Sequence, residues 1–245
     1  TDTMTLTISA GAPPVAEAGG PYSQNESAAV NGGWTVNLDG SGSTDDVGII
    51  RYVWDLGTDT FDGYNFNTNK WLVGGLVSQY DSLFLTGVSS WDNSAYIFSK
   101  DNYPRVDGMY MQARVKQTGG NAMIGFKNTT ARNHYDSMPH AVYFNSGTIN
   151  VYEDGSNRGS FGSYSYNTWY DVKVELKVPS GARYYYRPSG SGNWTLIYDS
   201  IYGSNADLKR GTTIYSGTFI FDDVKEIAAG PTPTFRLYGS VNITL

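Results

Sequence analysis

The chain has 245 residues, a formal net charge of −6, 16% charged residues and no cysteine. The lack of cysteine excludes disulfide bonds and thiolate chemistry. An acidic balance without a basic block argues against nucleic-acid binding, and no segment has the roughly 18 to 20 apolar residues of a membrane span. Short runs of strand-forming residues, bounded by Gly, Asn, Ser and Asp, predict an all-β protein.

The first predicted element is a strand in residues 3–8, where Thr alternates with apolar residues. Ala-Pro-Pro at residues 12–14 predicts a stiff linker, because X-Pro pairs favour extended backbone. We therefore treat residues 1–12 as a strand and linker. The strand is either the tail of a preceding repeat or a donor strand that pairs with a neighbouring chain at an open sheet edge.

Two strands around a turn are predicted between residues 36 and 57. Val36 and Leu38 alternate with polar neighbours, and Tyr52 and Trp54 mark the second strand. The Gly/Ser/Asp-rich loop between them has the residues that cap turns with their own side chains. A small sandwich that begins in this way needs a closing strand, and the next residues do not supply one.

These segments resemble a PKD domain, an Ig-like sandwich found in arrays on extracellular proteins, including archaeal and bacterial cell-surface proteins. The chain also ends with segments that are similar to the end of that domain. The resemblance implies a discontinuous Ig-like sandwich of residues 13–57 plus 230–245, interrupted by an inserted domain of residues 58–229. The segments that carry the resemblance are residues 13–22, 36–43, 52–57, 231–235 and 239–245.

The insertion contains several alternating runs that predict strands and hairpins. Residues 110–116 and 121–127 are joined by Gln-Thr-Gly-Gly, which predicts a tight hairpin. Residues 141–144 and 148–152 flank Asn-Ser-Gly and predict another. In residues 169–178, Tyr and Val alternate with charged residues, so the apolar members are expected to face the core.

The insertion opens with Phe-Asp-Gly and Lys-Trp in residues 61–71 and ends near Asp-Asp-Val at residues 222–224. Both ends resemble concanavalin-like jelly rolls, the fold of laminarinase-type enzymes, laminin-G modules and many lectins. The predicted fold is therefore an Ig-like sandwich with an inserted jelly-roll sandwich.

Catalysis is not expected. Laminarinase-type jelly rolls use a Glu-x-Asp-x-x-Glu strand, since two carboxyl groups must flank the glycosidic bond about 5 Å apart. The insertion has only three glutamates, Glu153, Glu175 and Glu226, and no such triplet. The chain also has two histidines, His134 and His140, and no Gly-x-Ser-x-Gly nucleophile elbow.

Calcium is the one cofactor that the resemblance implies. Concanavalin-like folds often carry it between the opening segment and the closing strand, which implies Asp62 and Asp223 as ligands, with Asp222 as a substitute. The alternative is that these acids cap turns or solvate an edge. In the Ig-like part, Asp45 and Asp46 are calcium candidates, with an Asx-turn as the alternative.

Glycan binding is the function that remains for a jelly roll without catalytic acids. Such a site needs exposed rings beside hydrogen-bonding side chains, and the chain has 20 tyrosines, most of which are expected to pack structurally. Trp54, Trp71 and Trp169 are predicted core anchors. The candidate ligand residues are Tyr110, Gln112, Arg114, Arg132, His134, Tyr135, Tyr184 and Tyr186.

Two functions stay open for this extracellular or cell-surface chain. The first is a non-catalytic, lectin-like module that binds a polysaccharide or other glycan. The second is a structural subunit of a surface layer or filament, whose partners are copies of itself or neighbouring PKD repeats. Four Asn-x-Ser/Thr sequons would mark surface loops in a secreted protein: Asn25, Asn128, Asn193 and Asn242.

Overall fold

A computed structural model describes residues 15–20, 26–31, 33–46, 49, 51–129, 133–202, 208–231 and 233–238. These residues form strands β1 to β16 and two short 3-10 helices, η1 (Glu26–Ala28) and η2 (Tyr135–Ser137). The predicted all-β class is therefore confirmed. Within these ranges no helix is long and apolar enough to cross a membrane. The strand predicted in residues 3–8 and the final residues 241–245 lie outside the described residues.

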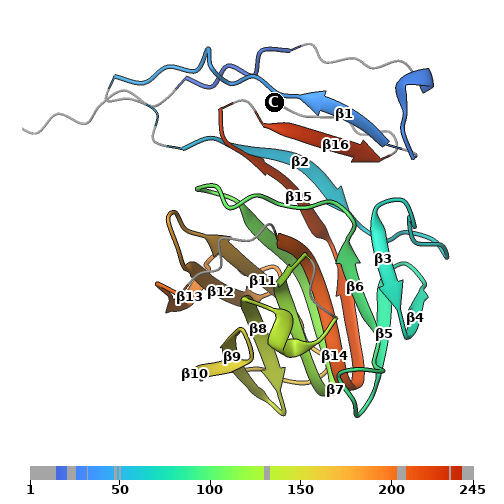
Figure 1. Ribbon diagram of the computed structural model, residues 1–245. Helices are drawn as coiled ribbons and strands as arrows, with labels where there is room; N and C mark the ends of the chain where they lie inside the picture. The colour runs from blue at the N-terminus through green and yellow to red at the C-terminus, as the bar shows by residue number, and fades with distance from the viewer. Residues whose placement is uncertain are drawn as a thin grey trace, which may run out of the picture.

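Twelve of the strands belong to one hydrogen-bonded sheet that two long strands, β7 and β14, fold into two layers (Figure 1). Sheet 1 consists of β10 (Ser156–Ser163), β9 (Thr148–Glu153), β8 (His140–Asn145), the second half of β7 (Tyr110–Asn128), the first half of β14 (Leu208–Asp222), β6 (Tyr96–Ser99) and β3 (Trp71–Gly74). Sheet 2 consists of β13 (Thr195–Asp199), β12 (Ala182–Pro188), β11 (Trp169–Leu176), the first half of β7, the second half of β14, β5 (Leu83–Val88) and β4 (Leu76–Gln79).

The prediction of a tight hairpin within residues 110–127 is wrong. The Gln-Thr-Gly-Gly segment does not turn the chain back, because residues 110–128 form one continuous strand paired with β14 along its length. Gly120 lies opposite Gly217, and both have φ +80°. A Cβ on Gly120 would lie 2.0 Å from the Ser216 carbonyl oxygen. The glycines therefore let two strands pass closely while both cross from one layer to the other.

The main core lies between the two layers. In β11 the side chains of Tyr170, Val172, Val174 and Leu176 are buried, as the alternation predicted. Val178, beyond the strand, is 54% exposed. The β8–β9 hairpin around the Asn-Ser-Gly turn is confirmed. Sheet 1 contributes Ala122, Ile124, Phe126, Val142, Phe144, Ile149 and Val151 to the same core.

The predicted tryptophan anchors divide between the interior and the surface. Trp71 is 1% exposed in the main core. Trp54 is half-buried against a smaller core of Val36, Leu38, Leu56 and Ala228. Trp169 is not an anchor, because it lies on the outer face of sheet 2 with Arg114 and Lys116 over its ring.

Strands near both ends of the described part of the chain pair above the sandwich (Figure 1). β15 (Val224–Ala229) follows directly on β14 and pairs with β2 (Val53–Asp59), and β1 (Gly33–Asn37) pairs with β16 (Thr234–Tyr238). The Gly230 carbonyl accepts a 3.0 Å hydrogen bond from Trp54 Nε1, and its amide donates to the Tyr52 carbonyl. Residues near both ends therefore share hydrogen bonds, while their division into a separate Ig-like domain stays a prediction.

A buried charge network lies where β15 leaves the sandwich. The Arg210 side chain is fully buried, pairs with Glu226 and lies 4.6 Å from the Tyr103 ring centre. Lys70 Nζ lies 2.5 Å from Glu226 Oε1 and 2.9 Å from Asp59 Oδ2. Because every buried charge here has an opposite partner, the network connects β2, β14, β15 and the chain entering β3.

Candidate functional site

The outer face of sheet 1 carries a second cluster of apolar and aromatic side chains. Successive side chains along a strand point to opposite faces of a sheet. Ala122, Ile124 and Val142 face the main core, so their neighbours Met123 and Tyr143 lie on the outer face. Five rings around this cluster are in contact, and we call them the ring face: Trp91, Tyr135, Tyr143, Tyr152 and Tyr215.

Trp91 is the centre of the ring face. Its ring centroid lies 5.4 Å from those of Tyr135 and Tyr215 and 6.1 Å from that of Tyr143. Tyr143 in turn meets Tyr152 edge-on at 5.0 Å. Except for the buried Tyr143, these rings are half-buried. They therefore present parts of several aromatic rings to the outside of the sandwich.

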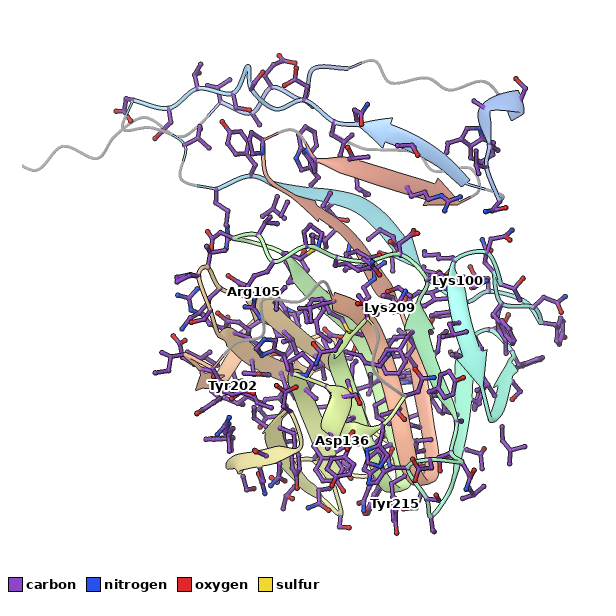
Figure 2. The ribbon with its side chains drawn as sticks, in the orientation of Figure 1. Lys100, Arg105, Asp136, Tyr202, Lys209 and Tyr215 are labelled. Atoms are coloured by element: carbon purple, nitrogen blue, oxygen red, sulfur yellow. The ribbon has the colours of Figure 1, made fainter. Side chains whose placement is uncertain are left out.

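Polar groups border the ring face where η2 lies over sheet 1. His134 precedes η2, and its Nδ1 accepts a hydrogen bond from the Asp136 amide. The same imidazole lies 2.7 Å from Asp136 Oδ1 and 3.9 Å from the exposed Asp92 carboxylate. Figure 2 shows Asp136 and Tyr215 together in the lower part of the molecule, away from β2 and β15. Rings, carboxylates and an imidazole thus share one surface.

Two phenols of the ring face, Tyr143 and Tyr152, keep their protons at neutral pH. Burial, together with the neighbouring phenols of Tyr152 and Tyr215, raises the pKa of Tyr143 to about 12. Burial also raises the pKa of Tyr152. A protonated phenol donates and accepts hydrogen bonds. The face can therefore offer stacking surfaces and hydrogen-bond donors in the same place.

The outer face of sheet 2 has rings of a different kind, because cations already cover them. Lys173 Nζ lies 4.3 Å from the Tyr185 ring centre, and the Arg187 guanidinium lies 4.3 Å from that of Trp194. Such cation–π contacts occupy the ring surface that a ligand would need. In the part of the chain that the structure describes, no such contact involves the five rings of the ring face.

The predicted ligand residues fall in three places. His134 and Tyr135 border or belong to the ring face, and Arg132 lies outside the described residues. Tyr110, Gln112 and Arg114 lie on the outer face of sheet 2, where Gln112 and Arg114 line a groove of about 420 Å³. The structure therefore does not bring these two groups together.

Tyr184 and Tyr186, two of the predicted ligand residues, lie on the inner side of their strand. Tyr184 is fully buried in the main core, and Tyr186 packs against that core. The ring that β12 presents outside is Tyr185. Three consecutive tyrosines have no polar–apolar alternation, so the sequence does not show which of them face inward.

The hydroxyl of Tyr184 belongs to a buried polar chain. Arg105 Nη2 lies 2.6 Å from His140 Nε2, and arginine can only donate, so His140 carries its proton on Nδ1. His140 Nδ1 then donates to Tyr184 Oη (2.9 Å), which donates to Glu153 Oε1 (2.7 Å). Arg158 Nε donates to the other carboxylate oxygen at 2.8 Å. These groups hold one another in place inside the sandwich.

All three glutamates of the predicted insertion are buried in ion pairs. Glu153 pairs with Arg158, Glu175 with Arg51 and Glu226 with Arg210. Burial alone would raise the pKa of Glu153, but the nearby His140 and hydrogen bonds from Tyr184 and Arg158 hold this pKa below its usual value. None of these side chains is placed as the exposed carboxyl pair that glycoside hydrolysis uses.

The predicted calcium ligands near the closing strand are already paired. Asp222 Oδ2 accepts hydrogen bonds from Arg114 Nη2 and Ser82 Oγ, both at 2.9 Å. Arg114 Nε lies 3.0 Å from Asp223 Oδ2, and Asp62 accepts from Thr60 Oγ1 at 2.6 Å. An arginine between two carboxylates fills the place of a cation, so these residues do not fit a calcium ion.

Asp45 and Asp46, the other two predicted calcium ligands, belong to no metal cluster of described residues. Asp45 and Asp46 follow the bridge between Val15 and Thr44. Among the described residues, no three or more His, Asp or Glu side chains are placed to hold a metal ion. An Asx-turn at the start of this loop is made by Asp39, whose Oδ1 accepts from the Ser41 amide at 3.0 Å, while the same role for Asp45 and Asp46 stays a prediction.

Two of the four sequons are described. Asn193 is exposed in the turn between β12 and β13, and Asn128 is half-buried at the end of β7. Asn25 and Asn242 lie outside the described residues. Of the described pair, Asn193 is the sequon that fits a surface loop.

No model of a known protein family and no curated protein matches the chain. Solved structures do have a similar fold. The carbohydrate recognition domain of Emp47p has a TM-score of 0.53 at 12% identity, covering 73% of this chain and 95% of that one. The exoplasmic/lumenal domain of VIP36 with bound Ca²⁺ and Man2 has a TM-score of 0.53 at 9% identity, covering 69% and 85%.

Porphyranase B from Zobellia galactanivorans has a TM-score of 0.50 at 12% identity, covering 74% of this chain and 94% of the enzyme. At such low identity these comparisons show the fold alone. They confirm the jelly-roll sandwich that the sequence predicted. The ring face lies on the outer surface of sheet 1. Of its residues and their neighbours, the sequence predicted only Tyr135 and the bordering His134 as ligand residues.

Proposed function

We propose that the chain is a non-catalytic, glycan-binding module of an extracellular or cell-surface protein, and that the glycan lies across the ring face. The supporting observation is that the five rings contact one another, have no cation from the described residues over them, and lie beside Asp92, His134 and Asp136. Sugars have apolar faces and hydroxyl rims, so stacking rings beside hydrogen-bonding groups suit them.

The side chains beneath the ring face support binding without cleavage. The outward positions of β7 and β8 at its centre are Met123, Ala141 and Tyr143, none of which is a carboxyl group. The glutamates of the same sandwich are paired with arginines. Cleavage needs a carboxylic acid and a carboxylate on either side of the scissile bond, and three glutamates that are each paired with an arginine do not supply them.

The similar structures support the ligand class in the same way. One is named as a carbohydrate recognition domain, and another holds Ca²⁺ and Man2. We extend to this chain the coarse class, a glycan, and neither a particular sugar nor an enzymatic activity. Calcium is not part of the proposed site, because Asp222 and Asp223, which were predicted to bind it at the closing strand, are paired with Arg114.

A glycan array on the full chain, followed by affinity measurements with Trp91→Ala, tests this function. Loss of the central stacking ring should weaken binding about fivefold, since one aromatic contact contributes roughly 1 kcal/mol. Trp194→Ala is the matched control, because Trp194 lies on the opposite layer with Arg187 over its ring. Binding to no glycan at all, or equal losses in both variants, would contradict the proposal.

A second function, a subunit of a surface layer or filament, is favoured by the small paired strands at the chain ends. Among the described strands, β1 pairs only with β16 and β2 only with β15. Their free edges suit strand addition by another copy or by a neighbouring PKD-like repeat. Deleting residues 1–10 should then dissolve oligomers in light-scattering measurements, and oligomers that persist would rule out donation by this segment.

A further inference from the structure

Arg114 occupies the centre of a row of alternating charges on the outer face of sheet 2. In the register of β14, β7 and β11, it lies directly between Asp222 and Asp171. Arg187 continues the row on β12, where its Nε donates to Asp171 Oδ2 at 2.8 Å. Opposite charges on facing positions stabilise a sheet. The guanidinium therefore stands among carboxylates from two strands.

Its contacts are those of a bound cation. Nη2 lies 2.9 Å from Asp222 Oδ2, and Nε lies 3.0 Å from Asp223 Oδ2. Asp222 is 2% exposed, and a buried carboxylate needs a positive partner. The partner here is covalently part of the chain, and the face of its guanidinium also lies 4.6 Å from the Trp169 ring centre.

The acids around Arg114 influence one another. Burial raises the pKa of Asp223, and the negative charges of Asp222, Asp171 and Asp62 raise it further, while Arg114 opposes them. Without the arginine, Asp222 and Asp223 would lose their cation, while Asp171 would keep Arg187. Carboxylate oxygens are among the ligands that calcium prefers.

We propose that Arg114 is a built-in counter-ion that takes the place of calcium at the closing strand. Removal of its charge opens a latent calcium site at Asp222 and Asp223. This inference is independent of the glycan proposal, since Arg114 and the ring face lie on opposite layers. The wild-type chain therefore needs no calcium here, and its stability depends on the arginine.

Thermal unfolding of the full chain tests this inference, with about 5 mM Ca²⁺ or with chelator, above the dissociation constants of weak extracellular sites. The wild-type midpoint should be the same in both. Arg114→Ser should melt lower in chelator and recover by roughly 5 °C in calcium, because a ligand of the native state stabilises it by mass action. A double variant with Asp223→Asn should lose the recovery.

Two controls separate the counter-ion role from a general loss of charge. Arg114→Lys keeps a cation and should stay insensitive to calcium. Arg187→Gln removes an arginine from the same row but leaves Arg114, so it should also gain no calcium response. If Arg114→Ser does not fold, calorimetric titration of the wild type decides. Calcium binding by the wild type that Asp222→Asn abolishes, or an Arg114→Ser variant that folds without a calcium response, would overturn the inference.

Discussion

Tyr184 joins two buried ionisable side chains through one hydroxyl. Its oxygen accepts from His140 Nδ1 and donates to Glu153 Oε1, and none of these three residues is more than 1% exposed. Tyr184→Phe keeps the ring packing but removes a partner from both groups, which costs about 1–3 kcal/mol. We expect the free energy of unfolding in urea to fall by that amount.

Tyr186→Phe is the matched control for this substitution. Tyr186 lies on the same side of β12 but is only half-buried, so water can replace contacts of its hydroxyl. Its loss should change the unfolding free energy by less than about 0.5 kcal/mol. Equal losses in the two variants would show that the Tyr184 hydroxyl does not bridge the buried pair.

The buried His140 side chain should make the free energy of unfolding depend on pH. Burial lowers its pKa below the usual value, the Glu153 carboxylate 3.8 Å away opposes this, and Arg105 adds to the lowering. A group with a lowered folded pKa stabilises the fold above its unfolded pKa of about 6.5, and this contribution is lost as pH falls. Unfolding free energy should therefore decrease below about pH 6.5, by up to roughly 1.4 kcal/mol per pH unit.

Urea unfolding of wild type and His140→Gln between pH 7.5 and 5 (roughly the range where an ordinary histidine titrates) checks this expectation. The variant should lose most of the slope, whatever its absolute stability. An equal slope in both proteins would assign the pH dependence to other groups.

At the scale of elements, the crossing of β7 and β14 depends on glycine. A Cβ at Gly120 would meet the Ser216 carbonyl oxygen at 2.0 Å, and φ there is +80°. Gly120→Ala should therefore destabilise the fold by about 3 kcal/mol or more, through strain and steric overlap. Gly119→Ala is the control, because nothing lies within 4 Å of a Cβ built there. Similar melting temperatures for both variants would contradict this account of the bend.

The sequence predicted elements best where polar and apolar residues alternate. The alternation in β11 and the Asn-Ser-Gly turn between β8 and β9 were sufficient to place both. The Gly-Gly pair in β7 was misleading, because glycines permit both a tight turn and a close crossing of strands. Which of these occurs depends on β14, about a hundred residues later in the chain.

The candidate site was harder to predict for a related reason. Strand β8 has apolar residues on both faces, so its pattern does not separate Tyr143, on the ring face, from Val142 in the core. Trp91 comes from a loop whose position depends on tertiary contacts. The calcium ligands were misjudged because Arg114 lies more than a hundred residues from Asp222 in sequence but directly opposite it in the sheet.

At the scale of the whole molecule, the chain leaves the small paired strands, builds the sandwich and returns to pair with them (Figure 1). The return depends on β15, which extends β14 out of the jelly roll and pairs with β2. A PKD-like domain that carries a jelly roll as an insertion remains our prediction for this arrangement. It would hold the ring face away from the ends through which repeats or copies connect.

The most direct test of glycan binding follows the six tryptophan side chains by their indole N–H signals in ¹H–¹⁵N NMR spectra. Titration with a glycan selected on the array should shift or broaden the Trp91 signal, because this ring is the centre of the proposed site. The signals of Trp169 and Trp194, on the other layer, should stay unchanged. An unchanged Trp91 signal with shifts at Trp169 or Trp194 would contradict the account.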